Sequence, residues 1–143
     1  MLRKLPEFPR KNSLANFLGK IFEEKRDKIQ SIVLFGSVAR GEYTIYSDID
    51  LLVIISEEHS SFKDRLYEYS KYSDGWVEAL VYTTREVDEM FKNFNPIILD
   101  ALYYGLVIYD KGFWKTLTKD FKNLLNKKVI VPKKNGWIIK SIA

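Results

Sequence analysis

The sequence of 143 residues contains no cysteine and a single glutamine, Gln30. Without cysteine, the chain cannot form a disulfide framework or a zinc site built on thiolates. Its apolar runs are short, as in Leu51–Ile55, so no segment can span a bilayer, and residues 1–6 lack the apolar stretch of a signal peptide. We therefore expect a soluble, cytoplasmic protein with no membrane partner. The scarcity of Gln and Cys, beside plentiful Lys, Ile and Tyr, is also typical of a thermophile.

The apolar content is that of a folded protein. The residues are 46% hydrophobic and 15% aromatic, which excludes a wholly disordered chain. A length of 143 residues is enough to bury one core but too short for two. No internal repeat or low-complexity linker interrupts the sequence. We therefore expect a single domain over residues 1–143.

The charge is divided unevenly along the chain. The whole sequence has 23 basic and 19 acidic residues, for a net charge of +4. Residues 111–143, the basic C-terminal region, hold nine Lys and one acid, Asp120, so the rest of the chain is net acidic. Three interpretations of the basic C-terminal region are open: a solvated face whose Lys protect a hairpin edge, a nucleic-acid contact, or a partner-protein contact.

Hydrophobic periodicity predicts that helices and strands alternate. Ser13 is the expected N-cap of the first helix, Thr84 the cap of a later one, and Asn95-Pro96 the start of another. The expected elements, in chain order, are a helix at 14–29, strands at 31–35 and 48–55, a helix at 59–72, a strand at 76–82, helices at 85–94 and 97–104, a strand at 106–109, a helix at 113–125, and a hairpin of strands at 129–131 and 137–139.

Residues 36–50 carry the strongest chemical signal. Gly36 ends a buried strand and allows a sharp turn that brings backbone amides close to a ligand. Ser37 and Arg40 follow on the expected first turn of a short helix, where amides favour phosphate. Asp48 and Asp50 are two apart at the start of the next strand, so both carboxylates project from one face. Two such acids, with phosphate oxygens and water, form the kind of site that Mg²⁺ prefers.

Glu78 is the acid of the strand expected at 76–82. If that strand pairs beside the Asp48–Ile55 strand, Glu78 becomes a third carboxylate on the same face. Three such acids could bind two metal ions about 3.5 to 4 Å apart. Without cations they would repel one another, and their pKa values would rise.

These residues resemble a known family. The spacing of Gly36-Ser37, ten residues and then Asp48-Ile49-Asp50 is similar to the signature of the polymerase-beta-type nucleotidyltransferase superfamily. The surrounding sequence is most similar to the minimal nucleotidyltransferases of bacteria and archaea. The resemblance implies an α+β fold, with a short mixed β-sheet flanked by helices. The core motif region is then 30–82, and residues 95–143 are a C-terminal extension of a helical part and a basic hairpin.

The resemblance also implies roles for individual residues. Gly36 and Ser37 would contact the nucleotide triphosphate. Arg40 would be a phosphate contact, and a structural ion pair is its alternative. Asp48 and Asp50 would bind metal. Glu78, where family members often have Asp, would be the third acid, which helps to bind metal and activates the attacking hydroxyl.

The implied reaction is metal-dependent transfer of a nucleotide, most often AMP from ATP, to a hydroxyl acceptor with release of pyrophosphate. It uses two Mg²⁺ ions. Minimal nucleotidyltransferases are often paired with a small helical HEPN-type protein in toxin–antitoxin modules, where they act as the antitoxin. No helical substrate-binding domain is evident, so a partner or a homodimer is expected to complete the cleft. The alternatives are a non-catalytic module that binds a nucleotide or a partner, and, less favoured, a phosphohydrolase.

Overall fold

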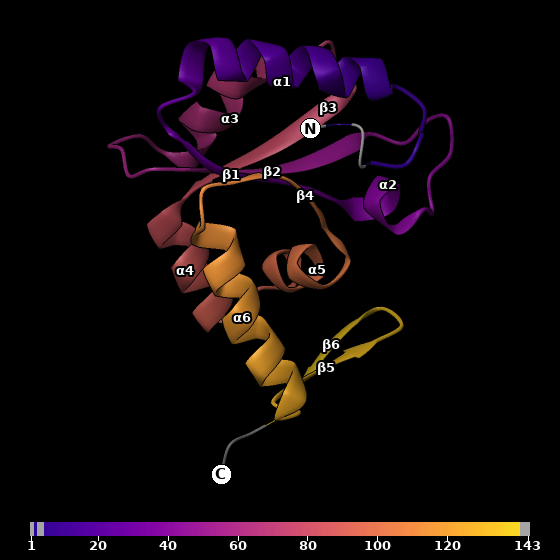
Figure 1. Ribbon diagram of the computed structural model, residues 1–143, viewed down its shortest axis with the longest axis vertical. Coiled ribbons are helices and arrows are strands. Elements are labelled where there is room, and N and C mark those ends of the chain that lie inside the picture. The colour runs from indigo at the N-terminus through magenta and orange to yellow at the C-terminus, as the bar shows by residue number, and fades with distance from the viewer. Residues whose placement is uncertain (1, 3–4, 141–143) are drawn as a thin grey trace.

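The computed structural model describes residue 2 and residues 5–140. Helices and strands alternate along most of this length (Figure 1). The elements are α1 (Lys11–Lys25), β1 (Ile29–Phe35), α2 (Gly36–Arg40), β2 (Ile49–Ile55), α3 (Phe62–Ser70), β3 (Val77–Thr83), α4 (Thr84–Lys92), α5 (Pro96–Tyr104), β4 (Leu106–Asp110), α6 (Phe113–Asn126), β5 (Ile130–Lys133) and β6 (Gly136–Ile139). Every predicted helix and strand is present, with ends shifted by a few residues.

The central sheet has four strands in the order β3-β2-β1-β4. β1 is antiparallel to both β2 and β4, whereas β2 is parallel to β3. The sheet is therefore mixed, and helices cover both of its faces (Figure 1). This arrangement confirms the α+β fold with a short mixed sheet.

The apolar run of β2 is buried on both faces of the sheet. Leu51 and Val53 pack in the core beneath α1 and α3. Leu52 and Ile54 point to the other face and pack against α4, α5 and α6. Each fully buried aliphatic side chain of this kind contributes about 1.5 to 3 kcal/mol to stability. The continuous apolar run thus packs against helices on both faces of the sheet, because a strand between two helical layers needs no polar face.

Two helix starts differ from the predicted caps. Thr83, one residue before the predicted Thr84, caps α4, and its side chain forms a capping box with Glu86. Ser13 lies inside α1, because the helix begins earlier, after Arg10 in a left-handed conformation. The Ser13 hydroxyl instead donates to Asp74 Oδ2 at 2.6 Å. Asn95 caps α5 as predicted, accepting from the Ile97 amide at 2.9 Å.

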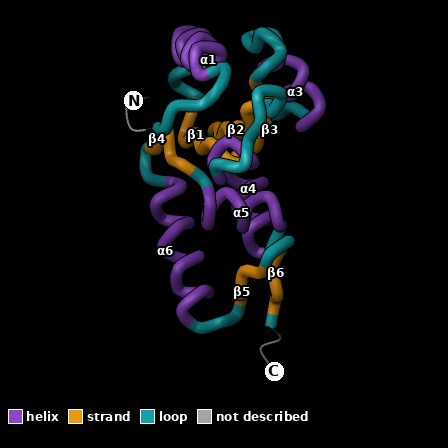
Figure 2. The backbone as a smooth tube through the Cα atoms, turned by 90° about the vertical axis from the view of Figure 1, so that its right-hand side faces the viewer, coloured by secondary structure: helices purple, strands orange, loops and turns teal. Residues whose placement is uncertain are grey.

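The β5–β6 hairpin lies beyond α5 and α6, at the end of the molecule opposite α1 (Figures 1 and 2). Its two strands are antiparallel and form a separate sheet. Trp137 anchors the hairpin, because its ring packs edge-on against Tyr103 of α5 and Phe121 of α6. Across residue 2 and residues 5–140, no helix has both the length and the apolar character needed to cross a membrane.

Candidate active site

Gly36 links the end of β1 to the start of α2. Its φ of +73° lies in the left-handed region, where L side chains are strained. A Cβ atom at this position would overlap a carboxylate oxygen of Asp50. Both observations require glycine here, and they place the backbone of the Gly36 turn directly against Asp50.

Asp48 and Asp50 flank the first residue of β2, Ile49. Asp50 pairs with Phe35 across the β1–β2 ladder, at the point where β1 ends. Because side chains alternate along a strand, Asp50 points to the same face as Leu52, toward α4, α5 and α6. Asp48 is exposed, and Asp50 is partly buried.

Glu78 is the direct neighbour of Asp50 on the adjacent strand. β2 and β3 are parallel, and their register pairs Asp50 with Glu78. Neighbouring strands lie about 4.8 Å apart, so the two side chains leave the sheet close together on one face. Glu78 is exposed. The predicted pairing of these two strands is confirmed.

The three acids influence one another electrostatically. Burial, and after it the nearby charges of Glu78 and Asp48, together raise the pKa of Asp50 to about 6. Like charges and a low-dielectric surrounding both penalise the ionised form. A cation at this point would reverse the effect, because it favours the ionised carboxylate.

The donor chemistry here fits a hard divalent cation. Mg²⁺ is usually held by one or two carboxylates together with phosphate oxygens and water, and Asp48 and Asp50 supply such a pair. Across the described residues, however, no three His, Cys, Asp or Glu side chains come together as a metal-binding group. Asp48 lies on the loop before β2, and Glu78 is turned to solvent. As they lie, the described side chains therefore do not assemble the triad expected for two metals.

Gly36, Ser37 and Arg40 line one cavity of about 280 Å³. The opposite wall comes from α5, through Ile97 and Asp100. The three predicted nucleotide-binding residues are thus brought together. Asp48, Asp50 and Glu78 do not line this cavity, but Asp50 touches its edge through the close contact with Gly36.

Arg40 forms the structural ion pair that was one of its two predicted alternatives. Its Nη2 lies 3.3 Å from Asp100 Oδ2. Its guanidinium carbon lies 4.1 Å from the ring centre of Tyr104. Asp100 and Tyr104 are four residues apart on α5, so they share one face of the helix. Nothing in the sequence connects them with Arg40, although their spacing identifies a polar stripe on an otherwise apolar helix.

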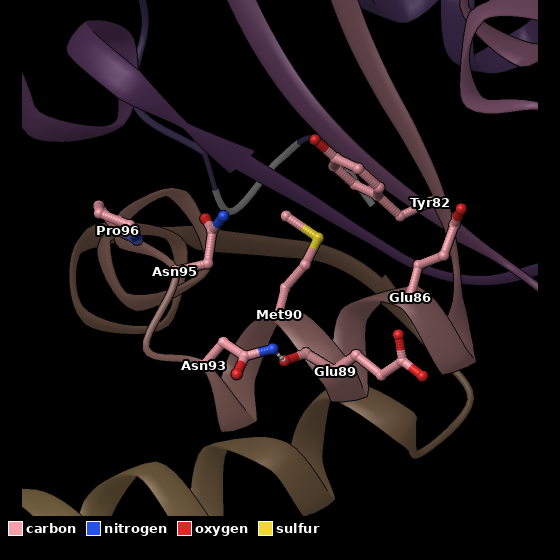
Figure 3. A pocket seen from close by; sticks show the side chains of 7 residues that line it. All are labelled: Tyr82, Glu86, Glu89, Met90, Asn93, Asn95 and Pro96. Carbon is pink, nitrogen blue, oxygen red and sulfur yellow. Dashed lines mark hydrogen bonds between the residues drawn. The ribbon is translucent and has the colours of Figure 1, made fainter.

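A second cavity, of about 490 Å³, lies between β3, α4 and the start of α5 (Figure 3). Tyr82, four residues after Glu78 on β3, and Met90 of α4 project into the same space. Glu86, Glu89, Asn93, Asn95 and Pro96 complete the lining. This cavity could not be predicted from the sequence, because its wall combines β3, α4 and the start of α5, which only the fold brings together.

Comparison with known proteins connects this geometry to a family. The family model described as "Nucleotidyltransferase domain" matches residues 17–131. A protein of Methanocaldococcus jannaschii, whose name assigns it provisionally to the protein adenylyltransferases, is 30% identical over 138 residues, covering 90% of this chain and 92% of that protein. A second protein of that organism with the same kind of name is 50% identical over 48 residues, covering 33% of this chain and 47% of that protein.

Two solved structures share the fold. A Sulfolobus solfataricus protein, provisionally named a nucleotidyltransferase, aligns over 70% of this chain and 79% of that chain, with a TM-score of 0.53 and 21% identity. A chain from a toxin–antitoxin structure with AMP-PNP aligns over 80% of this chain and 88% of that chain, with a TM-score of 0.52 and 15% identity. With its mixed sheet and the family model matched over most of its length, the chain belongs to the nucleotidyltransferase domain family.

Proposed function

We propose that this chain is a metal-dependent adenylyltransferase that moves AMP from ATP to a hydroxyl group of a partner protein, with release of pyrophosphate. The observation that carries the proposal is the in-register pair of Asp50 and Glu78, with Asp50 held against the Gly36 turn. The proposed phosphate-binding loop and the two acids therefore lie at the same end of neighbouring strands. Nucleotidyl transfer needs the loop and the acids next to each other, because the loop holds the triphosphate while the acids act at its α-phosphorus.

The cavity beside α2 is suited to the triphosphate. Its wall offers the Ser37 hydroxyl, backbone amides around Gly36 and the Arg40 guanidinium. Hydrogen bonds from charged or backbone donors to phosphate oxygens are short and strong. Because these donors are fixed by β1 and α2, they can orient the triphosphate before the reaction begins.

Asp48 and Asp50 are the residues that would hold Mg²⁺. The ion, when bound, neutralises charge on the phosphate oxygens and on the departing pyrophosphate. The raised pKa of Asp50 supports this assignment, because a carboxylate that is costly to ionise alone gains most from a cation.

Glu78 is placed to receive a proton. In the proposed step, the acceptor oxygen forms a bond to the α-phosphorus while the bond from that phosphorus to the bridging oxygen of the β-phosphate breaks. The hydroxyl proton passes to the Glu78 carboxylate, and the electron pair of the broken bond leaves with pyrophosphate. The exposure of Glu78 supports this role, since an acceptor on another protein must reach it.

A protein acceptor agrees with the names of the M. jannaschii relatives. We further propose a small helical HEPN-type partner, because one protein with this fold was solved as part of a toxin–antitoxin. Ile45 and Tyr46, on the loop before Asp48, are 60% and 80% exposed. Such exposed side chains, close in sequence to Asp48, offer a contact surface to the partner.

The proposal is tested by co-expressing the chain with the protein encoded beside it in the genome. Intact mass spectrometry of that protein is expected to show additions of one AMP moiety each. In vitro, label should transfer from ATP labelled at the α-phosphate and not from ATP labelled at the γ-phosphate. Asp50→Asn should abolish transfer, whereas Asp88→Asn, at an exposed position on α4, should not. Transfer of the γ-label, or full activity of Asp50→Asn, would contradict the proposal.

A further inference from the structure

The carboxylate of Asp100 connects the C-terminal hairpin with the cavity beside α2. The indole Nε1 of Trp137, on β6, donates a hydrogen bond to Asp100 Oδ1 at 2.8 Å. The other oxygen, Oδ2, faces Arg40 Nη2 at 3.3 Å. Each oxygen of Asp100 therefore has its own partner, and the two contacts together fix the plane of the carboxylate.

Arg40 is held by α5 in two ways. The edge of its guanidinium meets Asp100, and the ring of Tyr104 lies against its face at 4.1 Å. Its side chain is still 28% exposed and lines the cavity next to Ser37. A guanidinium has five N–H donors in a rigid plane, so one contact with Asp100 leaves others free for phosphate oxygens.

Trp137 is itself firmly placed. Its ring lies 5.4 Å from that of Tyr103 and 5.8 Å from that of Phe121, both in edge-on contact. Trp137 also lies beyond residues 17–131, the part of the chain that the family model matches. The hydrogen bond from Trp137 to Asp100 thus comes from a residue outside the segment that the family model matches.

We propose that Asp100 and Trp137 are positioning residues that orient Arg40 for the triphosphate of ATP. The inference rests on the proposed function, since it takes ATP as the ligand. Trp137 fixes Asp100, Asp100 fixes Arg40, and Arg40 meets the phosphates without first having to be ordered. Binding groups that are held in place before the ligand arrives lose less conformational entropy on binding, which increases affinity.

The test uses Trp137→Phe, which removes the indole N–H and leaves the net charge unchanged. Affinity is measured by isothermal titration calorimetry with MgCl₂ and an ATP analogue that has a methylene group between its α- and β-phosphorus atoms. We expect the Kd of Trp137→Phe to rise by about threefold to tenfold, which lies in the lower part of the range observed for coupled residues in contact. In an Arg40→Ala background, the same substitution is expected to change the Kd less than about twofold. Trp114→Phe is the matched control, because Trp114 is buried on α6 and Asp100's partners in the described residues are Arg40 and Trp137.

Three results would overturn the inference. An unchanged Kd in folded Trp137→Phe would show that the Trp137–Asp100 hydrogen bond does not affect nucleotide binding. An equal loss in the wild-type and Arg40→Ala backgrounds shows that the hairpin acts by a route other than Arg40. If the wild-type chain does not bind the analogue, both the proposed function and the inference are wrong. If it binds the analogue but Trp137→Phe and Arg40→Ala act independently, only the inference is wrong. If melting shows that Trp137→Phe is unfolded, the isosteric Asp100→Asn enters the same cycle, with the same coupling to Arg40 expected.

Discussion

Asp50 of β2 and Glu78 of β3 are paired in register on neighbouring parallel strands. Their carboxylates leave the same face of the sheet, yet their surroundings differ, because Asp50 is partly buried against Gly36 and Glu78 is open to solvent. The two residues can therefore have different roles. The buried acid is suited to hold a cation, and the exposed acid is suited to exchange a proton with an acceptor.

Replacing Glu78 tests this division. Glu78→Gln keeps the shape but cannot take a proton, and general-base catalysis typically contributes a factor of about 10² to 10⁴. We expect kcat to fall by about that factor while the Kd of the ATP analogue changes little. Glu78→Asp keeps a carboxylate on a shorter side chain and should retain part of the activity. Equal losses of ATP affinity and kcat in Glu78→Gln would instead assign Glu78 to nucleotide binding.

The raised pKa of Asp50 predicts how stability depends on pH without metal. The folded value is about 6 and the ordinary value is 3.8. The folded state therefore keeps a proton that the unfolded state has already released between these pH values. Linkage then makes the contribution of Asp50 fully present below about pH 4 and lost as pH rises through about 6. With solvent screening, its size is on the order of 1 to 2 kcal/mol.

This pH dependence is measured by urea unfolding of the wild type and Asp50→Asn between pH 4 and 7. The variant should lack the decline, so the difference in unfolding free energy between the two proteins should grow across this range. Added Mg²⁺ should restore stability to the wild type at neutral pH and leave the variant unaffected, because a ligand of the native state stabilises it. Parallel curves for the two proteins would show that Asp50 has an ordinary pKa.

Gly36→Ala separates backbone strain from the contact with Asp50. Gly36 and Gly41 both have φ of +73°, but a Cβ at Gly41 would meet nothing within 4 Å. Left-handed conformation costs an L residue about 1 to 2 kcal/mol, so both alanine variants should lose about that much stability. Only Gly36→Ala should also displace Asp50 and weaken binding of the ATP analogue. Unfolding curves and calorimetry of the two variants measure this, and equal affinities would show that the Gly36–Asp50 contact is unimportant for the site.

Much of the site could be predicted from local sequence. Gly36, Ser37, Asp48 and Asp50 lie within one short segment, where turn geometry and strand alternation decide the positions of the side chains. Glu78 required one further assumption, that its strand pairs beside β2. That assumption was correct: β2 and β3 are parallel neighbours, and they are joined by a helix, which is the usual connection of such strands.

The contacts of Arg40 could not be predicted in this way. Arg40 contacts Asp100 and Tyr104 only because α5 packs beside α2. Trp137 contacts Asp100 only because the hairpin folds onto α5. Periodicity identifies the buried face of a helix but does not identify its neighbour. The partner of Ser13 was likewise beyond local prediction, since its hydroxyl donates to Asp74, a residue distant in sequence.

The basic C-terminal region can now be assigned a predicted role. Lys127, Lys128, Lys133 and Lys134 are exposed around the β5–β6 hairpin, a two-stranded sheet separate from the main one. Charged Lys beside open strand edges prevents pairing with other chains. We therefore expect Lys133→Thr/Lys134→Thr to increase self-association, measured by light scattering over a concentration series. The wild type should show no binding to a fluorescent single-stranded RNA, even at low salt. RNA binding that weakens steeply with salt would instead assign these Lys to phosphate contacts.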